Sequence, residues 1–78
     1  MNINVTSKHI SNGMHREASH CPVAISLKEK FKTNNIEVYT FGIYIDSIYH
    51  PIPRRVKFFI FEFDNKRKVK PFNFKLNT

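Results

Sequence analysis

The stretch CPVAISLKEKF, Cys21–Phe31, constrains the fold of this chain more than any other part. Pro22 suits the first turn of a helix, because the N–H that proline lacks would have no helical partner there. Cys21 is then the expected N-cap, and Ala24 and Leu27 begin an apolar face at helical spacing. This stretch predicts an amphipathic helix, whose apolar face other elements must cover.

The chain has 78 residues, which limits the number and size of the elements that can cover this helix. A chain this short predicts a single domain over residues 1–78. Such a small domain buries a limited fraction of its surface and is only marginally stable alone. Association into a homo-oligomer would add buried area, so we expect one.

Alternating apolar residues predict strands on both sides of this helix. Ile3 and Val5 alternate with polar neighbours, and Lys8–Asn12 suits a short turn of helix ending at Gly13. After the helix, period-two patterns predict an antiparallel meander of three strands with a turn at Asp46-Ser47. Its strands are expected at residues 37–41, 43–45 and 48–50.

The segment Arg54–Asp64 is compatible with two structures. Its many aromatic and β-branched residues favour a strand, which would pair with residues 69–76 as a hairpin. Its apolar residues also fall at the i, i+3, i+4 and i+7 positions of a helix, namely Val56, Phe59, Ile60 and Phe63. Pro53 before it and Asn65 after it, in a left-handed conformation, would bound such a helix. We predict the helix.

These elements together predict an α+β fold. A small antiparallel sheet, built from the three-strand meander plus terminal strands, packs against two helices. Residues 71–76 alternate cleanly and form the last strand. That strand is expected to join the meander or to pair with the N-terminal strand.

Cysteine, histidine and acidic residues offer little for catalysis or metal binding. The single cysteine allows no intramolecular disulfide framework. His9, His15, His20 and Cys21 match no common zinc spacing, and no acid is placed to orient a nucleophile. We expect a buried structural cysteine, solvent-exposed histidines, no metal, no cofactor and no enzyme activity.

Targeting signals are also missing from the pattern. The N-terminal residues have no apolar core of the kind that signal peptides carry. The apolar run Phe58–Phe61 is far too short to span a bilayer. We therefore expect a cytoplasmic protein that does not associate with membranes.

Positive charge is the strongest indication of function. The net charge is +7, and seven of the thirteen Lys and Arg residues lie between Arg54 and Lys70. Such a chain attracts anions, although a run such as Lys66-Arg67-Lys68 can also be a solvated loop. Free amides at the start of the 21–31 helix, with Tyr44 or Tyr49, would complete an anion pocket. The expected ligand-binding residues are Lys8, His9, Arg16, His20, Arg54, Arg55 and Lys57.

Several short motifs carry a family resemblance that spans nearly the whole chain. They are Val5-Thr6, His9-Ile10, Gly13, Cys21-Pro22-Val23-Ala24, Pro53, Phe59-Ile60, Phe63-Asp64 and Pro71-Phe72-Asn73-Phe74. In these motifs the chain resembles small bacteriophage accessory proteins with a CPVA-type helix start and a C-terminal PF-F strand. The resemblance implies a helix over residues 54–64 and a role in the cytoplasm of a bacterial host.

Accessory proteins of this kind often counter host defence, which sets the expected function. The first expectation is non-catalytic binding and sequestration of a nucleotide-like anionic signal. Two alternatives stay open: a nucleic-acid-binding regulator, and an inhibitor that docks on a host defence protein. Exposed aromatic residues on a basic surface would favour single-stranded nucleic acid. We expect most of the eight Phe residues to lie in the core instead.

Overall fold

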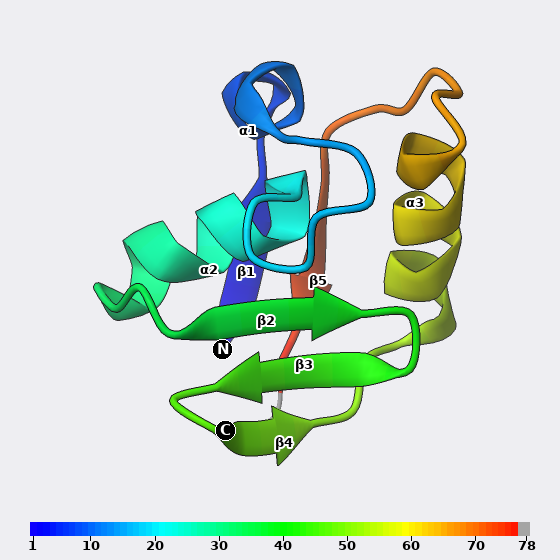
Figure 1. Ribbon diagram of the computed structural model, residues 1–78. Coiled ribbons are helices and arrows are strands. Elements are labelled where there is room, and N and C mark those ends of the chain that lie inside the picture. Colours follow the sequence, from blue (N-terminus) through cyan, green and yellow to red (C-terminus); the bar gives the residue numbers. More distant parts are fainter. Residues whose placement is uncertain (77–78) are drawn as a thin grey trace.

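Three helices and five strands make up the computed structural model, which describes residues 1–76 (Figure 1). The fold is α+β, as predicted, and the short turn of helix expected at Lys8–Asn12 is present beside the two longer helices. The helices are α1 (Ser7–Asn12), α2 (Pro22–Phe31) and α3 (Arg54–Asp64). The strands are β1 (Asn2–Val5), β2 (Ile36–Tyr39), β3 (Gly42–Ile45), β4 (Ile48–His50) and β5 (Phe72–Lys75).

The strands of the described residues form two separate antiparallel sheets. β2, β3 and β4 form the predicted meander, and β1 pairs with β5. In the second sheet Ile3 lies opposite Phe74 and Val5 lies opposite Phe72. Of the two expectations for the last strand, pairing with the N-terminal strand is therefore confirmed. The strands before and after Gly42 are shifted slightly from the prediction, because Gly42 begins β3 rather than forming a turn.

The two-stranded sheet is extended by hydrogen bonds at its open end. The terminal amino group of Met1 donates to the carbonyl of Leu76 at 3.2 Å. The backbone N–H of Leu76 donates back to the carbonyl of Met1 at 2.9 Å. The first residue is thus held beside the last described one.

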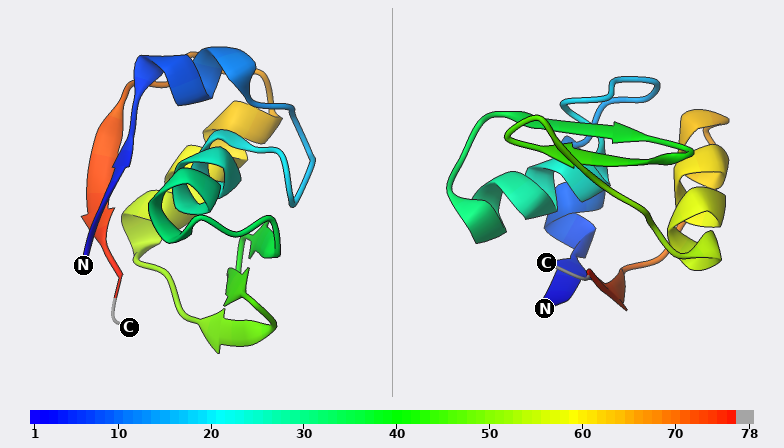
Figure 2. Two further views of the ribbon diagram at one scale, coloured as in Figure 1. Left: turned by 90° about the vertical axis from the view of Figure 1, so that its left-hand side faces the viewer. Right: turned by 90° about the horizontal axis from the view of Figure 1, so that it is seen from below.

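Helix α2 lies between the two sheets and contacts both β1 and β2 (Figure 2). The Cys21 thiol caps it by accepting the N–H of Ala24 at 3.4 Å, as expected for that position. Val23, Ala24 and Leu27 are completely buried. The helix ends at Lys32, whose φ of 54° is in the left-handed region.

Segment 54–64 is a helix, so the hairpin alternative is wrong. Its four apolar residues at helical spacing are all buried, and this packing outweighs the β propensity of the segment. The helix ends at Asp64-Asn65, as predicted, but the expected left-handed conformation of Asn65 is wrong. Asn65 has a φ of −92° and its side chain donates to the Phe61 carbonyl, while Lys66 takes the left-handed conformation.

Buried apolar side chains from both sheets, α2, α3 and the segments beside them form one cluster. Five of the eight Phe residues lie in this core or pack against it: Phe31, Phe59, Phe63, Phe72 and Phe74. Phe41, Phe58 and Phe61 are exposed instead. The prediction that most Phe residues are core is confirmed, and the three exceptions need another explanation.

The turn between β3 and β4 has an unusual sequence for its geometry. Asp46 and Ser47 both have positive φ, 50° and 70°. Two-residue hairpins of this kind favour Asn-Gly or Gly-Gly, because a side chain disfavours the left-handed region. Thr33 partly compensates by donating its hydroxyl to the Asp46 carboxylate at 2.9 Å.

We predict that Ser47→Gly stabilises the protein by about 0.5–1 kcal/mol, because glycine adopts positive φ without steric cost. Urea unfolding followed by circular dichroism measures the change. The matched variant Ser11→Gly, inside α1, should instead lower stability by up to about 0.5 kcal/mol. Destabilisation by Ser47→Gly would contradict the assignment of strain to this turn.

Candidate functional site

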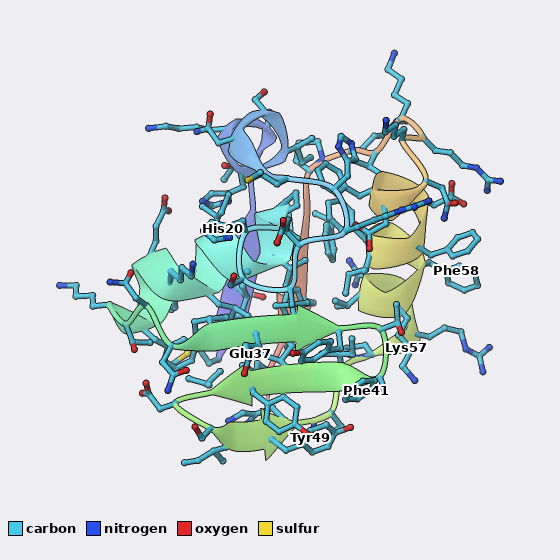
Figure 3. The ribbon with its side chains drawn as sticks, in the orientation of Figure 1. His20, Glu37, Phe41, Tyr49, Lys57 and Phe58 are labelled. Atoms are coloured by element: carbon cyan, nitrogen blue, oxygen red, sulfur yellow. The ribbon has the colours of Figure 1, made fainter. Side chains whose placement is uncertain are left out.

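Helix α3 presents a second stripe of residues on the side opposite its buried face. Arg54, Lys57, Phe58 and Phe61 recur at the i, i+3, i+4 and i+7 positions and are all exposed. Phe58 is 61% exposed and Phe61 is 50% exposed. Figure 3 shows Phe58 projecting from α3 away from the rest of the protein. Two exposed rings beside two cations are unusual for a surface helix, and they mark this side as a candidate site. The guanidinium carbon of Arg67 lies over the second ring, 5.6 Å from the centre of Phe61.

A groove runs along this side of the protein, between α3 and the segment that leads into β5. Its volume is about 330 Å³. Its walls carry three positive charges, one negative charge and three aromatic rings. The charged residues are Arg55, Lys68, Lys70 and Glu62, and the rings are those of Phe58, Phe59 and Phe72. We call the groove together with the outer stripe of α3 the basic aromatic face.

Arg55 is held in place within this face by two contacts. One guanidinium nitrogen donates to the Asn73 carbonyl at 2.6 Å. The guanidinium carbon lies 5.9 Å from the centre of the Phe72 ring. An arginine has five N–H donors in a fixed fork, so these contacts fix its position and leave donors for an anion.

The acidic residues near this face are already engaged. Segment 54–70 contains seven cations and two acids. Glu62 pairs with Arg67, whose guanidinium nitrogen lies 3.3 and 3.4 Å from the two carboxylate oxygens. Asp64 accepts the backbone N–H of Arg16 at 2.9 Å. The two acids offset two of the seven positive charges, so segment 54–70 keeps a net charge of +5 that an incoming anion meets.

The structure divides the predicted ligand-binding residues into separate places. Arg54, Arg55 and Lys57 come together in the first turn of α3. Arg16 lies at the opposite end of that helix, where its backbone contacts Asp64. With Lys66 and His15 it borders a different hollow, of about 560 Å³. Lys8 is exposed on α1, and His20 is exposed in the loop before α2.

His9 has a structural role. It is 6% exposed, so the expectation of a solvent-exposed histidine is wrong here. Its Nδ1 accepts the backbone N–H of Thr6 at 2.9 Å, and Nε2 lies 2.8 Å from the Glu29 carboxylate. Because Nδ1 is an acceptor, Nε2 carries the proton and donates it to Glu29. Both ring nitrogens are used, and His9 has none to offer a ligand.

We predict that His9→Ala lowers the free energy of unfolding by about 1–2 kcal/mol, through loss of the hydrogen bond from the Thr6 N–H and of the bond to Glu29 on α2. His20→Ala is the matched control on an exposed histidine, with an expected change within about 0.5 kcal/mol. Both are measured by urea unfolding. Equal changes in the free energy of unfolding for the two substitutions would contradict a structural role of His9.

The N-terminus of α2 is closed to an anion. Cys21 is 3% exposed, and the amides of Ala24 and Val23 face its sulfur. The expectation of free amides at this helix start is therefore wrong. Burial raises the pKa of the Cys21 thiol from 9.0 to about 11, against the smaller lowering effect of these amides. A neutral, buried thiol is neither a nucleophile nor a metal ligand.

We predict that Ellman's reagent does not react with native Cys21 at pH 8 and titrates one thiol per chain in denaturant. Because folding raises the pKa of this thiol, the unfolded chain loses the proton first as pH rises. The contribution of Cys21 to stability therefore falls between about pH 9 and 11. Fast reaction of the native protein would contradict its burial.

Sequence reasoning missed Lys68, Lys70, Phe58, Phe61 and Phe72 as parts of the site. A signal was present for two of them. The segment 54–64 has more aromatic residues than one helix face can bury, so Phe58 and Phe61 had to be exposed once the helix was chosen. Nothing local in the sequence indicates that residues 68–72 return alongside α3.

Residues 1–76 contain neither a metal-binding cluster nor a membrane-spanning helix. No three His, Cys, Asp or Glu side chains gather closely enough to hold a metal ion. No helix there combines the length and apolar character that crossing a membrane requires.

The resemblance to phage accessory proteins remains a prediction. Comparison of the chain with protein-family models, curated proteins and solved structures finds no match.

Proposed function

We propose that this protein binds, without catalysis, an anion that carries both phosphate and a nucleobase, and that it does so on the basic aromatic face. The exposure of Phe58 and Phe61 on the same side of α3 as Arg54 and Lys57 carries this proposal. Exposed rings cost free energy in water, and a stacked base would cover them.

The arrangement favours this ligand class over other anions. An arginine fork such as that of Arg55 matches the oxygens of a phosphate, and lysines such as Lys68 and Lys70 add positive charge. An acidic protein or inorganic phosphate would use the cations alone. A nucleotide also uses the rings, since each base presents a flat face for stacking.

The shape of the groove bears on how the ligand is held. Sites for small molecules usually enclose most of the ligand. This groove is open to solvent, so the monomer would cover one side of a nucleotide. Sequestration of a small nucleotide signal therefore calls for a second copy of the chain over the groove, which agrees with the expected homo-oligomer.

In the setting that the phage resemblance implies, such binding would withdraw a nucleotide signal from host defence. The exposed rings favour the second candidate, a nucleic-acid-binding regulator, for the same surface. Docking on a host defence protein gains no support from a specific contact. Placement in the bacterial cytoplasm belongs to the same proposal.

We predict that Lys68→Gln/Lys70→Gln weakens binding of a fluorescein-labelled oligothymidylate of about 12 nucleotides and lowers the slope of log affinity against log salt by about one to two units. Fluorescence anisotropy at several salt concentrations measures both. Lys30→Gln/Lys75→Gln removes the same charge from α2 and β5, away from the groove, and should leave most of the affinity.

Equal losses in the two double variants would mean that net charge alone attracts the probe. Absence of binding by the unmodified protein at low salt, to this probe and to ATP, would sink the proposal. A native mass measurement with and without ATP tests whether two copies close over a small nucleotide.

A further inference from the structure

The outer face of the meander carries a continuous row of aromatic rings. Tyr39 stacks on Phe41 with ring centres 5.1 Å apart and planes within 2°. Tyr39 meets Tyr44 edge-on at 6.1 Å, and Tyr44 meets Tyr49 at 5.5 Å. We call these four residues the aromatic row.

The row faces solvent rather than the core. Phe41 is 55% exposed and Tyr49 is 47% exposed, whereas Ile43 and Ile45, the neighbours of Tyr44 on β3, are buried. The Tyr49 hydroxyl donates to the Phe41 carbonyl at 2.9 Å and so ties β4 to the β2–β3 turn. The Tyr49 ring lies directly on Gly42, where an added Cβ would come within 2.3 Å of it. These rings are therefore held in place while exposed.

The aromatic row and the basic aromatic face meet at α3. Phe41 and Ile60 line one hollow of about 310 Å³, so the β2–β3 turn borders the helix. Lys57 precedes Ile60 by one helical turn on that side. In Figure 3 Lys57 lies at the start of α3 next to Phe41, with Phe58 beyond it. Lys57 thus joins the two surfaces.

The other end of the row has the opposite charge. Glu37 is exposed on β2 and lies opposite Tyr44 on β3. Its carboxylate accepts the Tyr39 hydroxyl at 3.0 Å. Figure 3 places Glu37 farther along β2, away from the turn and from α3. A phosphate chain would be repelled there and attracted to the end with Lys57.

From this arrangement we propose that the ligand is single-stranded nucleic acid, which runs from the groove over Lys57 and stacks its bases on Phe41 and Tyr49. This inference rests on the proposed function and specifies its ligand. A duplex hides its base faces in its own stack, and a mononucleotide is too small to occupy both surfaces. DNA and RNA strands share the chemistry that the rings and cations recognise.

The tyrosines provide a direct test. The chain has three Tyr and no Trp, and all three Tyr lie in the aromatic row. Tyrosine emission is therefore a label-free reporter of this surface. Oligothymidylate or oligouridylate of about 12 nucleotides should quench it, after correction for absorption by the strand. Inorganic polyphosphate, which has charge but no bases, should bind without quenching.

Substitutions in the aromatic row test its contribution to strand binding separately from that of the groove. Phe41→Ala and Tyr49→Ala should each weaken strand binding on the order of 5- to 100-fold, the range for one stacked base. Gly42→Ala should act in the same direction by pushing the Tyr49 ring aside while keeping it. Ile48→Ala is the matched control, because it removes an exposed apolar side chain of β4 that lies outside the row. Circular dichroism checks that each variant is folded.

The outcomes distinguish this inference from the proposed function. Loss of binding in Lys68→Gln/Lys70→Gln, with unchanged binding in the row variants and no quenching of tyrosine emission in the unmodified protein, would overturn the strand path and leave the groove as the site. Equal affinity for ATP and for the 12-nucleotide strand would also overturn it. If neither strand nor ATP binds, the proposed function itself fails.

Discussion

The apolar side of α2 holds together two sheets that share no hydrogen-bonded ladder. Neither sheet is stable alone, because two or three short strands cannot bury enough apolar surface. Val23, Ala24 and Leu27 are completely buried where this helix contacts β1 and β2. Capping at Cys21 fixes where the helix begins, and therefore which residues face each sheet. The Cys21 thiol suits this buried position, because it accepts a helix N–H and also packs like a small apolar side chain.

Helix α3 carries both stability and the candidate site. The residues of its buried face, Val56, Phe59, Ile60 and Phe63, fill part of the core. The outer stripe has the same spacing but begins two residues earlier, and it carries the exposed cations and rings. One rigid element therefore spaces the binding groups at fixed helical intervals. Such a site needs little reordering when a ligand arrives, since the backbone is already fixed by the core.

Local patterns in the sequence were enough to predict the helices, the meander and the cap at Cys21. Each depends on neighbours within a few residues, such as Pro22 after Cys21 or the spacing of Val56 and Phe59. Contacts between residues far apart in the sequence were harder to predict. The pairing of His9 with Glu29 crosses twenty residues, and the approach of Lys68 and Lys70 to α3 depends on where β5 pairs. Of the predicted ligand-binding residues, Arg54, Arg55 and Lys57 lie together, because they are neighbours in the chain.

The bonds between Met1 and Leu76 join residues 75 positions apart, so the folding route has a strong topological constraint. Closing so long a loop costs on the order of 4 kcal/mol of chain entropy, which only the completed pairing of β1 with β5 and its packing on α2 offset. The meander and the helices are local and can form early, whereas β1 must wait for the last strand. During synthesis the apolar residues of β1 therefore lack their partner strand until β5 has been made.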